Sequence, residues 1–232
     1  MVMDDPSDVI VPGVLRPKDA ATLVLVRRDA DGPRVLMGCR SSGMAFMANK
    51  YVFPGGRMDP GDQRIPVTAD LRPQVMARVA RGITTARARG LALAAVRETY
   101  EETGLLVGVR AEPPRTRSPA WNAFFAHGIA PRLDGLTFIA RAITPPNRTR
   151  RFDARFFMAE ADIIAHALDA AAHEELLTPA WLTLAEARAL DLPAITRRVL
   201  DEVELRLDDR PEADRPVPFF RFIRGKTAQT WL

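Results

Sequence analysis

The sequence predicts an α+β fold, in which strands come first, one long helix follows, and further strands and helices complete the chain. Short runs of β-branched and apolar residues, bounded by Gly, Pro and Asp, dominate the early part of the chain. A long stretch with helical periodicity begins after them. Strands and helices do not alternate strictly, as they would in a doubly wound parallel sheet. We therefore predict an α+β domain.

The first strands are predicted at 21–27 and 34–40, where the sequence reads ATLVLVR and RVLMGCR. Asp31-Gly32 lies between them and favours a tight hairpin turn. A third short strand at 50–53 runs into Pro54-Gly55-Gly56. Two adjacent glycines permit a positive φ and let bare backbone approach a ligand. The end of this strand is therefore a candidate binding position.

The remaining elements are predicted from hydrophobic periodicity, capping residues and the positions of Gly and Pro. We expect helices at about 69–81, 86–103, 119–126, 183–190 and 193–207, and strands at 105–109, 135–144, 152–158, 175–181 and 219–223. Thr84 or Thr85 caps the helix at 86–103, and Gly104 stands where a glycine ends a helix. In the helix at 119–126, Trp121 is either a core residue or a surface on which a nucleobase stacks.

A length of 232 residues and an apolar fraction of 47% suit one domain with a buried core. Residues 1–19 contain three prolines and four aspartates without periodicity. We predict a flexible N-terminal arm there and a domain spanning 20–232. No apolar run is long enough to cross a membrane, and the start of the chain lacks a basic-then-apolar signal pattern. We therefore expect a soluble, cytoplasmic protein without membrane contact.

Arginine dominates the basic side chains: the net charge is +4, with 30 Arg against 3 Lys. Arginine binds phosphate through two parallel hydrogen bonds, so a phosphorylated ligand is one interpretation. The other is that an Ala- and Arg-rich composition reflects the base content of the genome. The sequence has no basic stripe interleaved with aromatic residues, and we do not expect nucleic acid to be a partner.

Three acids fall on the same side of the long helix. Glu98, Glu101 and Glu102 are spaced i, i+3, i+4. Clustered carboxylates repel one another unless a cation neutralises them, and hard ions such as Mg²⁺ or Mn²⁺ favour oxygen ligands. The single cysteine, Cys39, excludes a cysteine-rich zinc site, and the chain has only three histidines. A divalent-cation site made of carboxylates is one interpretation, and a solvated acidic helix face is the other.

Gly56-x5-Asp62, followed by Arg97-Glu98-Thr99-Tyr100-Glu101-Glu102-Thr103-Gly104-Leu105, resembles the Nudix box, G-x5-E-x7-R-E-U-x-E-E-x-G-U, where U is a bulky apolar residue. Thr99 stands at a U position, Asp62 replaces the first glutamate, and 34 residues separate Asp62 from Arg97 where the pattern has x7. An insertion at this point is similar to that of a Nudix subgroup with coenzyme A-hydrolysing members. Phe152-Asp153-Ala154-Arg155-Phe156-Phe157 adds to this resemblance.

The resemblance implies an α/β/α sandwich around a mixed sheet, with an inserted helical segment at 63–90 and a C-terminal helical extension at about 183–232. It also implies hydrolysis of a nucleoside diphosphate linked to another moiety, with Mg²⁺ or Mn²⁺ as cofactor. By position, the metal ligands are the carboxylates of Glu98, Glu101 and Glu102 and the carbonyl of Gly55. Arg97 lies i−4 from Glu101 and would orient its carboxylate.

The resemblance leaves the general base open. Family members use either a glutamate of the motif or an acid from a later loop. Glu174 and Glu175 are candidates for the outside acid, with a solvated turn as the alternative, and His173 stands beside them. Asp62 would be a supporting acid, either as a metal ligand or as a contact of a bound water.

Substrate contacts are predicted at basic residues. The segment 63–90 has six arginines against one acid, so Arg78 and Arg81 would contact the outer phosphates of the substrate. Arg151 belongs to a second basic cluster, at a hairpin tip. Alternatively, the segment is a surface appendage over the sheet or a homodimer interface. Coenzyme A or acyl-coenzyme A leads as the substrate, and ADP-ribose follows. A non-catalytic Nudix-fold module that binds a nucleotide is the alternative function.

Overall fold

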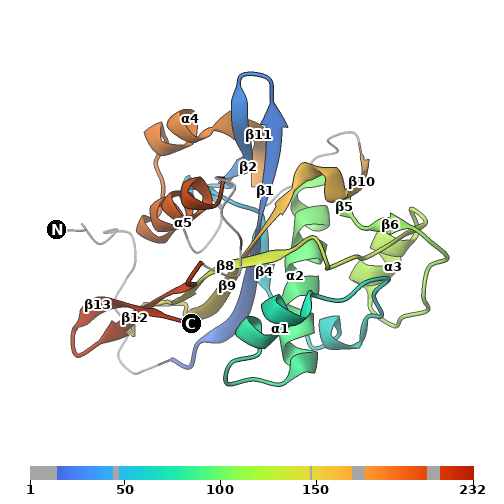
Figure 1. The fold of residues 1–232 in the computed structure, drawn as a ribbon, viewed down its shortest axis with the longest axis horizontal. Coiled ribbons are helices and arrows are strands. Elements are labelled where there is room, and N and C mark those ends of the chain that lie inside the picture. Colours follow the sequence, from blue (N-terminus) through green and yellow to red (C-terminus); the bar gives the residue numbers. More distant parts are fainter. Residues whose placement is uncertain (1–14, 44–46, 147, 169–175, 208–214) are drawn as a thin grey trace.

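The centre of the protein is a mixed β-sheet with helices on both faces (Figure 1). The computed structural model describes residues 15–43, 47–146, 148–168, 176–207 and 215–232. Within these residues the main sheet has nine strands, and seven of them follow the order β11-β2-β1-β9-β8-β12-β13, with β3 beside β2 and β4 beside β1. The predicted α+β class and the mixed sheet are confirmed.

The strands of the main sheet have the following bounds: β1 Lys18–Asp29, β2 Gly32–Arg40, β3 Tyr51–Val52, β4 Gly55–Arg57, β8 Thr137–Ile143, β9 Phe152–Glu160, β11 Leu176–Thr183, β12 Pro218–Ile223 and β13 Lys226–Trp231. Two small sheets pair β5 Leu105–Val107 with β10 Ile164–Ala167 and β6 Val109–Arg110 with β7 Ile129–Ala130. The helices are α1 Pro73–Val79, α2 Thr85–Thr103, α3 Pro119–Phe125, α4 Leu184–Ala189 and α5 Ala194–Arg206, and η1 Asp62–Arg64 is a 3₁₀ turn.

Strand β1 is buried on both faces and organises the sheet. It pairs antiparallel with β2 through a two-residue turn, in which Asp29 faces Gly32, and parallel with β9. Leu23 packs with the helices on one face, whereas Val24 packs with those on the other. Because successive side chains of a strand point to opposite faces, this apolar run fills both cores at once.

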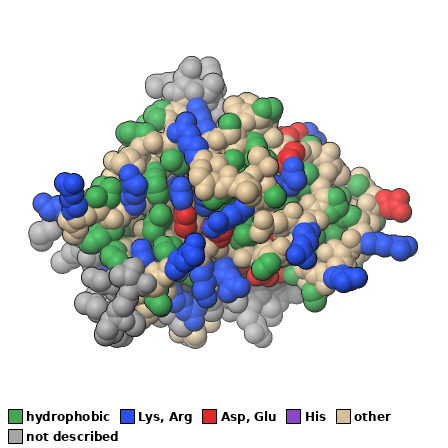
Figure 2. All heavy atoms as spheres, turned by 90° about the horizontal axis from the view of Figure 1, so that it is seen from below, with side chains coloured by type: hydrophobic (Ala, Val, Ile, Leu, Met, Phe, Trp, Pro, Cys, Tyr) green, Lys and Arg blue, Asp and Glu red, His purple; other side chains and the backbone are tan. Residues whose placement is uncertain are grey.

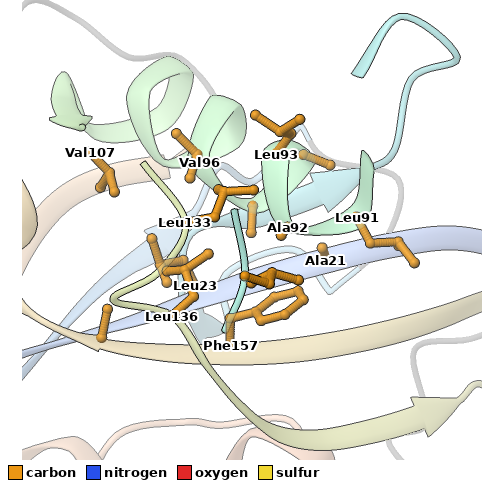
Figure 3. Close-up of a cluster of buried hydrophobic side chains, with 14 of the residues drawn as sticks. Ala21, Leu23, Leu91, Ala92, Leu93, Val96, Val107, Leu133, Leu136 and Phe157 are labelled. Atoms are coloured by element: carbon orange, nitrogen blue, oxygen red, sulfur yellow. The ribbon is translucent and has the colours of Figure 1, made fainter. Parts of the chain in front are cut away.

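Helix α2 covers one face of the sheet, and α4 and α5 cover the other (Figure 1). The core beneath α2 contains Leu91, Leu93 and Val96 of the helix, packed over Leu23 of β1 and Phe157 of β9 (Figure 3). Removal of this apolar surface from water is the main stabilising contribution to the position of α2.

The ends of α2 are fixed by local signals. The side chain of Thr84 accepts a hydrogen bond from the backbone N–H of Arg87, and Gly104 adopts a left-handed conformation with φ of 71°. An oxygen-bearing side chain satisfies an otherwise unpaired N–H at the start, and glycine adopts the left-handed conformation at low cost at the end. The predicted helix at 86–103 therefore begins one residue earlier and ends as expected.

The insertion at 63–90 contributes to the main core. Its residues form the end of η1, helix α1 and the first turns of α2. Ile65, Leu71, Val75 and Val79 are all buried in the core beneath α2. The insertion is thus an integral layer of the domain and not a loosely attached appendage.

Several elements differ from their predicted bounds. Helix α1 is shorter than 69–81, because Pro73 at its first position begins it and a turn follows Val79. The strand at 105–109 is divided at Gly108, where an added Cβ would overlap the carbonyl oxygen of Ala130. The C-terminal extension ends in the β12–β13 hairpin, and β12 joins the main sheet parallel to β8. Among the described residues, no helix is long and apolar enough to cross a membrane.

Candidate active site

The acidic side of α2 faces the glycine pair at the end of the third strand. Strand β4 pairs with β1, so that Gly56 lies opposite Ala21 and Gly55 opposite Thr22. The backbone N–H of Gly55 donates a 2.9 Å hydrogen bond to Oε2 of Glu102, whose side chain is almost fully buried. This contact joins the helix to the glycine backbone that the sequence predicts as a binding position.

Glu98 lies directly against Gly56. A Cβ atom at position 56 would stand 2.5 Å from the carboxylate carbon of Glu98, which is closer than non-bonded atoms approach. A Cβ at position 55 would meet the α-carbon of Thr22 at 2.6 Å. At position 55 the backbone of β1 leaves no room for a side chain, whereas at position 56 the carboxylate of Glu98 would have to move to admit one.

Arg97 is at the centre of the site and uses all five of its N–H groups. Nε and Nη2 donate to the carboxylate of Asp62 at 3.1 and 3.2 Å, and Nη2 also donates to the carbonyl of Arg57 at 2.9 Å. Nη1 donates to Glu98 at 2.9 Å and to Glu101 at 2.6 Å. The planar guanidinium therefore fixes the relative positions of three carboxylates.

The pKa of Arg97 is raised even though the residue is buried. Burial alone would lower the pKa of this guanidinium, but the hydrogen bond to Asp62 and the charges of Glu98 and Glu101 outweigh it. For Glu101 the balance is the reverse: burial raises the pKa of its carboxyl, and Arg97 offsets only part of that effect. Glu101 is also the more accessible of the two acids beside Arg97, with side-chain exposures of 34% against 14% for Glu98.

Asp62 is fully buried and accepts four hydrogen bonds. Besides the two from Arg97, it accepts one from the indole Nε1 of Trp121 at 2.8 Å and one from the backbone N–H of Asp59 at 2.8 Å. A carboxylate has about four lone-pair sites. The four donors therefore account for its acceptor capacity, and Asp62 contacts Arg97 rather than the open side of the site.

A close approach of η1 to α2 lets a short aspartate reach Arg97. A Cβ at Gly90 would lie 2.6 Å from Cγ of Gln63, the residue that follows Asp62. After the insertion, the chain therefore comes back to η1, and α2 packs tightly on it. This close packing brings the carboxylate of Asp62 within hydrogen-bond distance of Arg97.

The donor set is suited to a hard divalent cation. The carboxylates of Glu98 and Glu102 contact the glycine backbone of β4, and Arg97 holds a third carboxylate, that of Glu101, beside Glu98. In the described part of the chain, no three His, Cys, Asp or Glu side chains converge as a finished ligand cluster. Arg97 lies between Glu98 and Glu101 and donates to both. These residues supply the oxygen donors that such an ion prefers. Arg97 holds two of the carboxylates, those of Glu98 and Glu101, in place.

The structure distributes the other predicted site residues over the molecule. Arg78 donates to the carbonyl of Arg215, and Arg151 donates to the carbonyl of Thr144 and also contacts the carbonyl of Leu15. Arg81 is exposed after α1. The candidate bases His173, Glu174 and Glu175 lie outside the described residues.

Trp121 has a partner that sequence reasoning does not identify. Its side chain is fully buried, packs on Phe124 at 5.2 Å between ring centroids, and donates to Asp62. The core interpretation of this residue is confirmed. The hydrogen bond joins residues 59 positions apart, and no local pattern signals such a contact.

Comparison with solved structures identifies similar proteins. A NUDIX hydrolase from Alicyclobacillus acidocaldarius is 28% identical, with a TM-score of 0.59 over 80% of this chain and 90% of that chain. The NUDIX domain of Shewanella oneidensis NrtR, solved with ADP ribose, is 14% identical, with a TM-score of 0.49 over 84% and 90%. A MutT protein from Bacillus halodurans is 13% identical, with a TM-score of 0.46 over 92% and 97%.

No family model and no curated protein matches the chain. The family assignment rests on the sandwich fold, the divided motif on β4, η1 and α2, and the similarity to the Alicyclobacillus enzyme. These three observations agree with one another. The fold and the divided motif are those of the Nudix hydrolase family, and the comparison with solved structures supports this assignment.

Proposed function

We propose that this protein is a metal-dependent pyrophosphohydrolase that cleaves the diphosphate linkage of a nucleoside diphosphate derivative, with coenzyme A or acyl-coenzyme A as the leading substrate. One observation carries the proposal: Arg97 holds Glu98 and Glu101 beside the glycine backbone that Glu102 contacts. A diphosphate brings negative charge to a site that is already negative. The site therefore requires a cation.

The residues that would hold Mg²⁺ or Mn²⁺ are Glu98, Glu101 and Glu102, together with the carbonyl of Gly55. When bound, such an ion neutralises charge on the diphosphate and orients it toward an attacking water. Arg97 acts as a positioning residue, because its Nη1 donates hydrogen bonds to the carboxylates of both Glu98 and Glu101. Asp62 supports Arg97 from the interior, where four hydrogen-bond donors fix the position of its carboxylate.

Glu174 and Glu175 are our candidates for the acid that accepts a proton from the attacking water. The described residues that flank the segment 169–175 support this proposal. The N–H of Leu168 donates to the carbonyl of Gly104, at the end of the acidic helix, and Leu176 pairs with Arg40 of β2. Glu174→Gln and Glu175→Gln are compared as single variants. The variant that removes the base should lower kcat more than the other, and both should bind Mn²⁺ as the wild type does.

The charge of the surface supports a phosphate-rich substrate. On the face seen in Figure 2, Lys and Arg side chains are spread across the surface, and several of them lie near the middle beside a few acidic side chains. Arg81, exposed after α1, is our candidate for contact with the outer phosphates. Charge reversal by Arg81→Glu should raise KM for coenzyme A. The same reversal at the exposed Arg198 of α5 serves as the control, and an equal effect of both variants would reject the contact.

A panel of diphosphate compounds tests the activity. The panel contains coenzyme A, acetyl-coenzyme A, ADP-ribose and a dinucleotide polyphosphate, each with Mg²⁺ or Mn²⁺. We expect hydrolysis by the wild type and by Glu204→Gln, a change at an exposed acid of α5, and loss of turnover in Glu102→Gln with folding retained. No turnover by the wild type, together with measurable nucleotide binding, would instead identify a non-catalytic binding module.

A further inference from the structure

We infer that Trp121 is a positioning residue of the metal site, and that it acts through the hydrogen bond from its indole N–H to Asp62. This inference rests on the proposed function, because it assigns a role in holding the acids of α2. Trp121 belongs to α3, an element outside the divided motif. It would therefore be a part of the catalytic machinery that the motif does not contain.

The first step is a continuous chain of hydrogen bonds. Nε1 of Trp121 and Nε of Arg97 donate to the same oxygen of Asp62, Oδ1, at 2.8 and 3.1 Å. The other end of the guanidinium, Nη1, donates to Glu98 and Glu101. Each hydrogen bond is directional. The indole therefore restrains the carboxylate of Asp62, and Asp62 in turn restrains the guanidinium that holds Glu98 and Glu101.

The second step is the burial of the chain. Trp121 and Asp62 are fully buried, and Arg97 is 4% exposed. A buried carboxylate that loses one donor cannot recruit bulk water in its place. Without the indole N–H, Oδ1 of Asp62 would keep only its contact with Nε of Arg97. Rotation of that carboxylate would then move the guanidinium, which has no spare N–H group.

The third step separates positioning from packing. Trp121 also belongs to an aromatic cluster, with Phe124 at 5.2 Å and Phe125 at 5.6 Å between ring centroids. Trp121→Phe keeps an aromatic ring there and removes the N–H donor. Phe125→Leu disturbs the same cluster without any change in hydrogen bonding, because phenylalanine has no polar atom in its side chain. Phe125→Leu is therefore the matched control for packing.

Direct titration with Mn²⁺, by calorimetry on the metal-stripped full chain, tests the inference without a substrate. We expect Trp121→Phe to weaken Mn²⁺ binding by about tenfold, in the range found when a group that orients a metal ligand is removed. Phe125→Leu should lower Tm at least as much and leave the Mn²⁺ dissociation constant unchanged. Equal Mn²⁺ affinities for wild type and Trp121→Phe, or equal losses in both variants, would overturn the inference.

A double-mutant cycle tests the route through Asp62. If Trp121 acts through this carboxylate, Trp121→Phe should weaken Mn²⁺ binding no further in an Asp62→Asn background. Additive losses in the double variant would contradict that route. Wild type that binds Mn²⁺ and hydrolyses a diphosphate, with no effect of Trp121→Phe, would remove this inference and leave the proposed function standing. Wild type that binds no Mn²⁺ would overturn both.

A spectroscopic signature provides an independent readout. In a Trp181→Phe/Trp231→Phe background, Trp121 is the single tryptophan of the chain. Mg²⁺ is used here because it is diamagnetic and does not itself quench fluorescence. We expect Mg²⁺ to shift the indole emission with the same midpoint as its effect on activity, and Asp62→Asn to abolish that shift. Emission that is insensitive to saturating Mg²⁺ would contradict the coupling.

Discussion

The guanidinium of Arg97 meets the carboxylate of Asp62 through two hydrogen bonds, at 3.1 and 3.2 Å, in the protein interior. The two residues are 35 positions apart, on opposite sides of the insertion at 63–90. Their side chains are 4% and 1% exposed. The contact joins the two parts of the divided motif, because Asp62 belongs to the first part and Arg97 lies on α2, the helix that carries the acids.

Asp62→Asn keeps the shape of the side chain and removes its charge. Because the variant leaves the Arg97 guanidinium without its buried counter-charge, we expect a loss of about 3–5 kcal/mol in the free energy of unfolding. Urea denaturation measures this loss. Asp134→Asn is the matched control, since Asp134 pairs with Arg132 at the surface and should cost at most about 1 kcal/mol. Similar losses in both variants would show that burial of the pair between Asp62 and Arg97 does not increase its contribution to the free energy of unfolding.

Arg97→Lys preserves the positive charge and removes the planar fork. A lysine ammonium has three donors on a point charge and cannot span Asp62, Glu98 and Glu101 in their present positions. We expect kcat/KM to fall by about 10–100-fold, as for other residues that orient metal ligands. Arg188→Lys is the control, because Arg188 also contacts two acids, Asp201 and Glu204, but on the exposed surface of α5. Unchanged kinetics in Arg97→Lys would mean that a positive charge at position 97 is enough for activity without the planar guanidinium.

Gly56→Ala should disturb the acidic site directly. The new methyl group would overlap the carboxylate of Glu98, and that carboxylate would have to move away from β4. We expect weaker Mn²⁺ binding and lower kcat. Gly61→Ala is the control inside the same motif: its φ of −66° suits alanine, and the nearest atom to a new Cβ is 3.8 Å away, on Ser118. Gly61→Ala should retain activity and gain up to about 1 kcal/mol of stability. Equal activities in the two variants would contradict the packing of Glu98 on Gly56.

Leu71→Ala tests whether the insertion belongs to the core. Leu71 is 5% exposed and packs in the core beneath α2. Truncation of a buried leucine costs about 2–5 kcal/mol through lost burial and the cavity that remains. Leu205→Ala removes the same atoms from a side chain that is 56% exposed and should have little effect. Thermal and urea unfolding of both variants measure the difference, and a small loss in Leu71→Ala would make the insertion an independent appendage.

Local signals in the sequence predict the acidic helix closely. The cap at Thr84, the glycine at 104 and the i, i+4 contact between Arg97 and Glu101 all follow from short-range geometry, and all are present. Strand β13, KTAQTW, is missed because its polar residues lie at the sheet edge, where no alternation between buried and exposed positions is required. Strand β10 is missed because its partner, β5, is distant in the chain.

The contacts that hold the acids of the site in place cannot be predicted from the sequence for a similar reason. The contacts of Asp62 with Arg97 and Trp121 depend on how the insertion returns to α2 and on where α3 packs. Both are tertiary relationships between segments without a shared local pattern. A motif therefore identifies the acids that would contact the metal, whereas the residues that hold those acids emerge only from the fold.

Mn²⁺ binding to the metal-stripped protein, measured by calorimetry, tests the central claim most directly, because the acidic side of α2 either binds a divalent cation or does not. We predict saturable binding to the wild type, binding at least about tenfold weaker in Glu102→Gln, and wild-type affinity in Glu204→Gln. Equal affinities in Glu102→Gln and Glu204→Gln, or no binding to the wild type, would contradict the account.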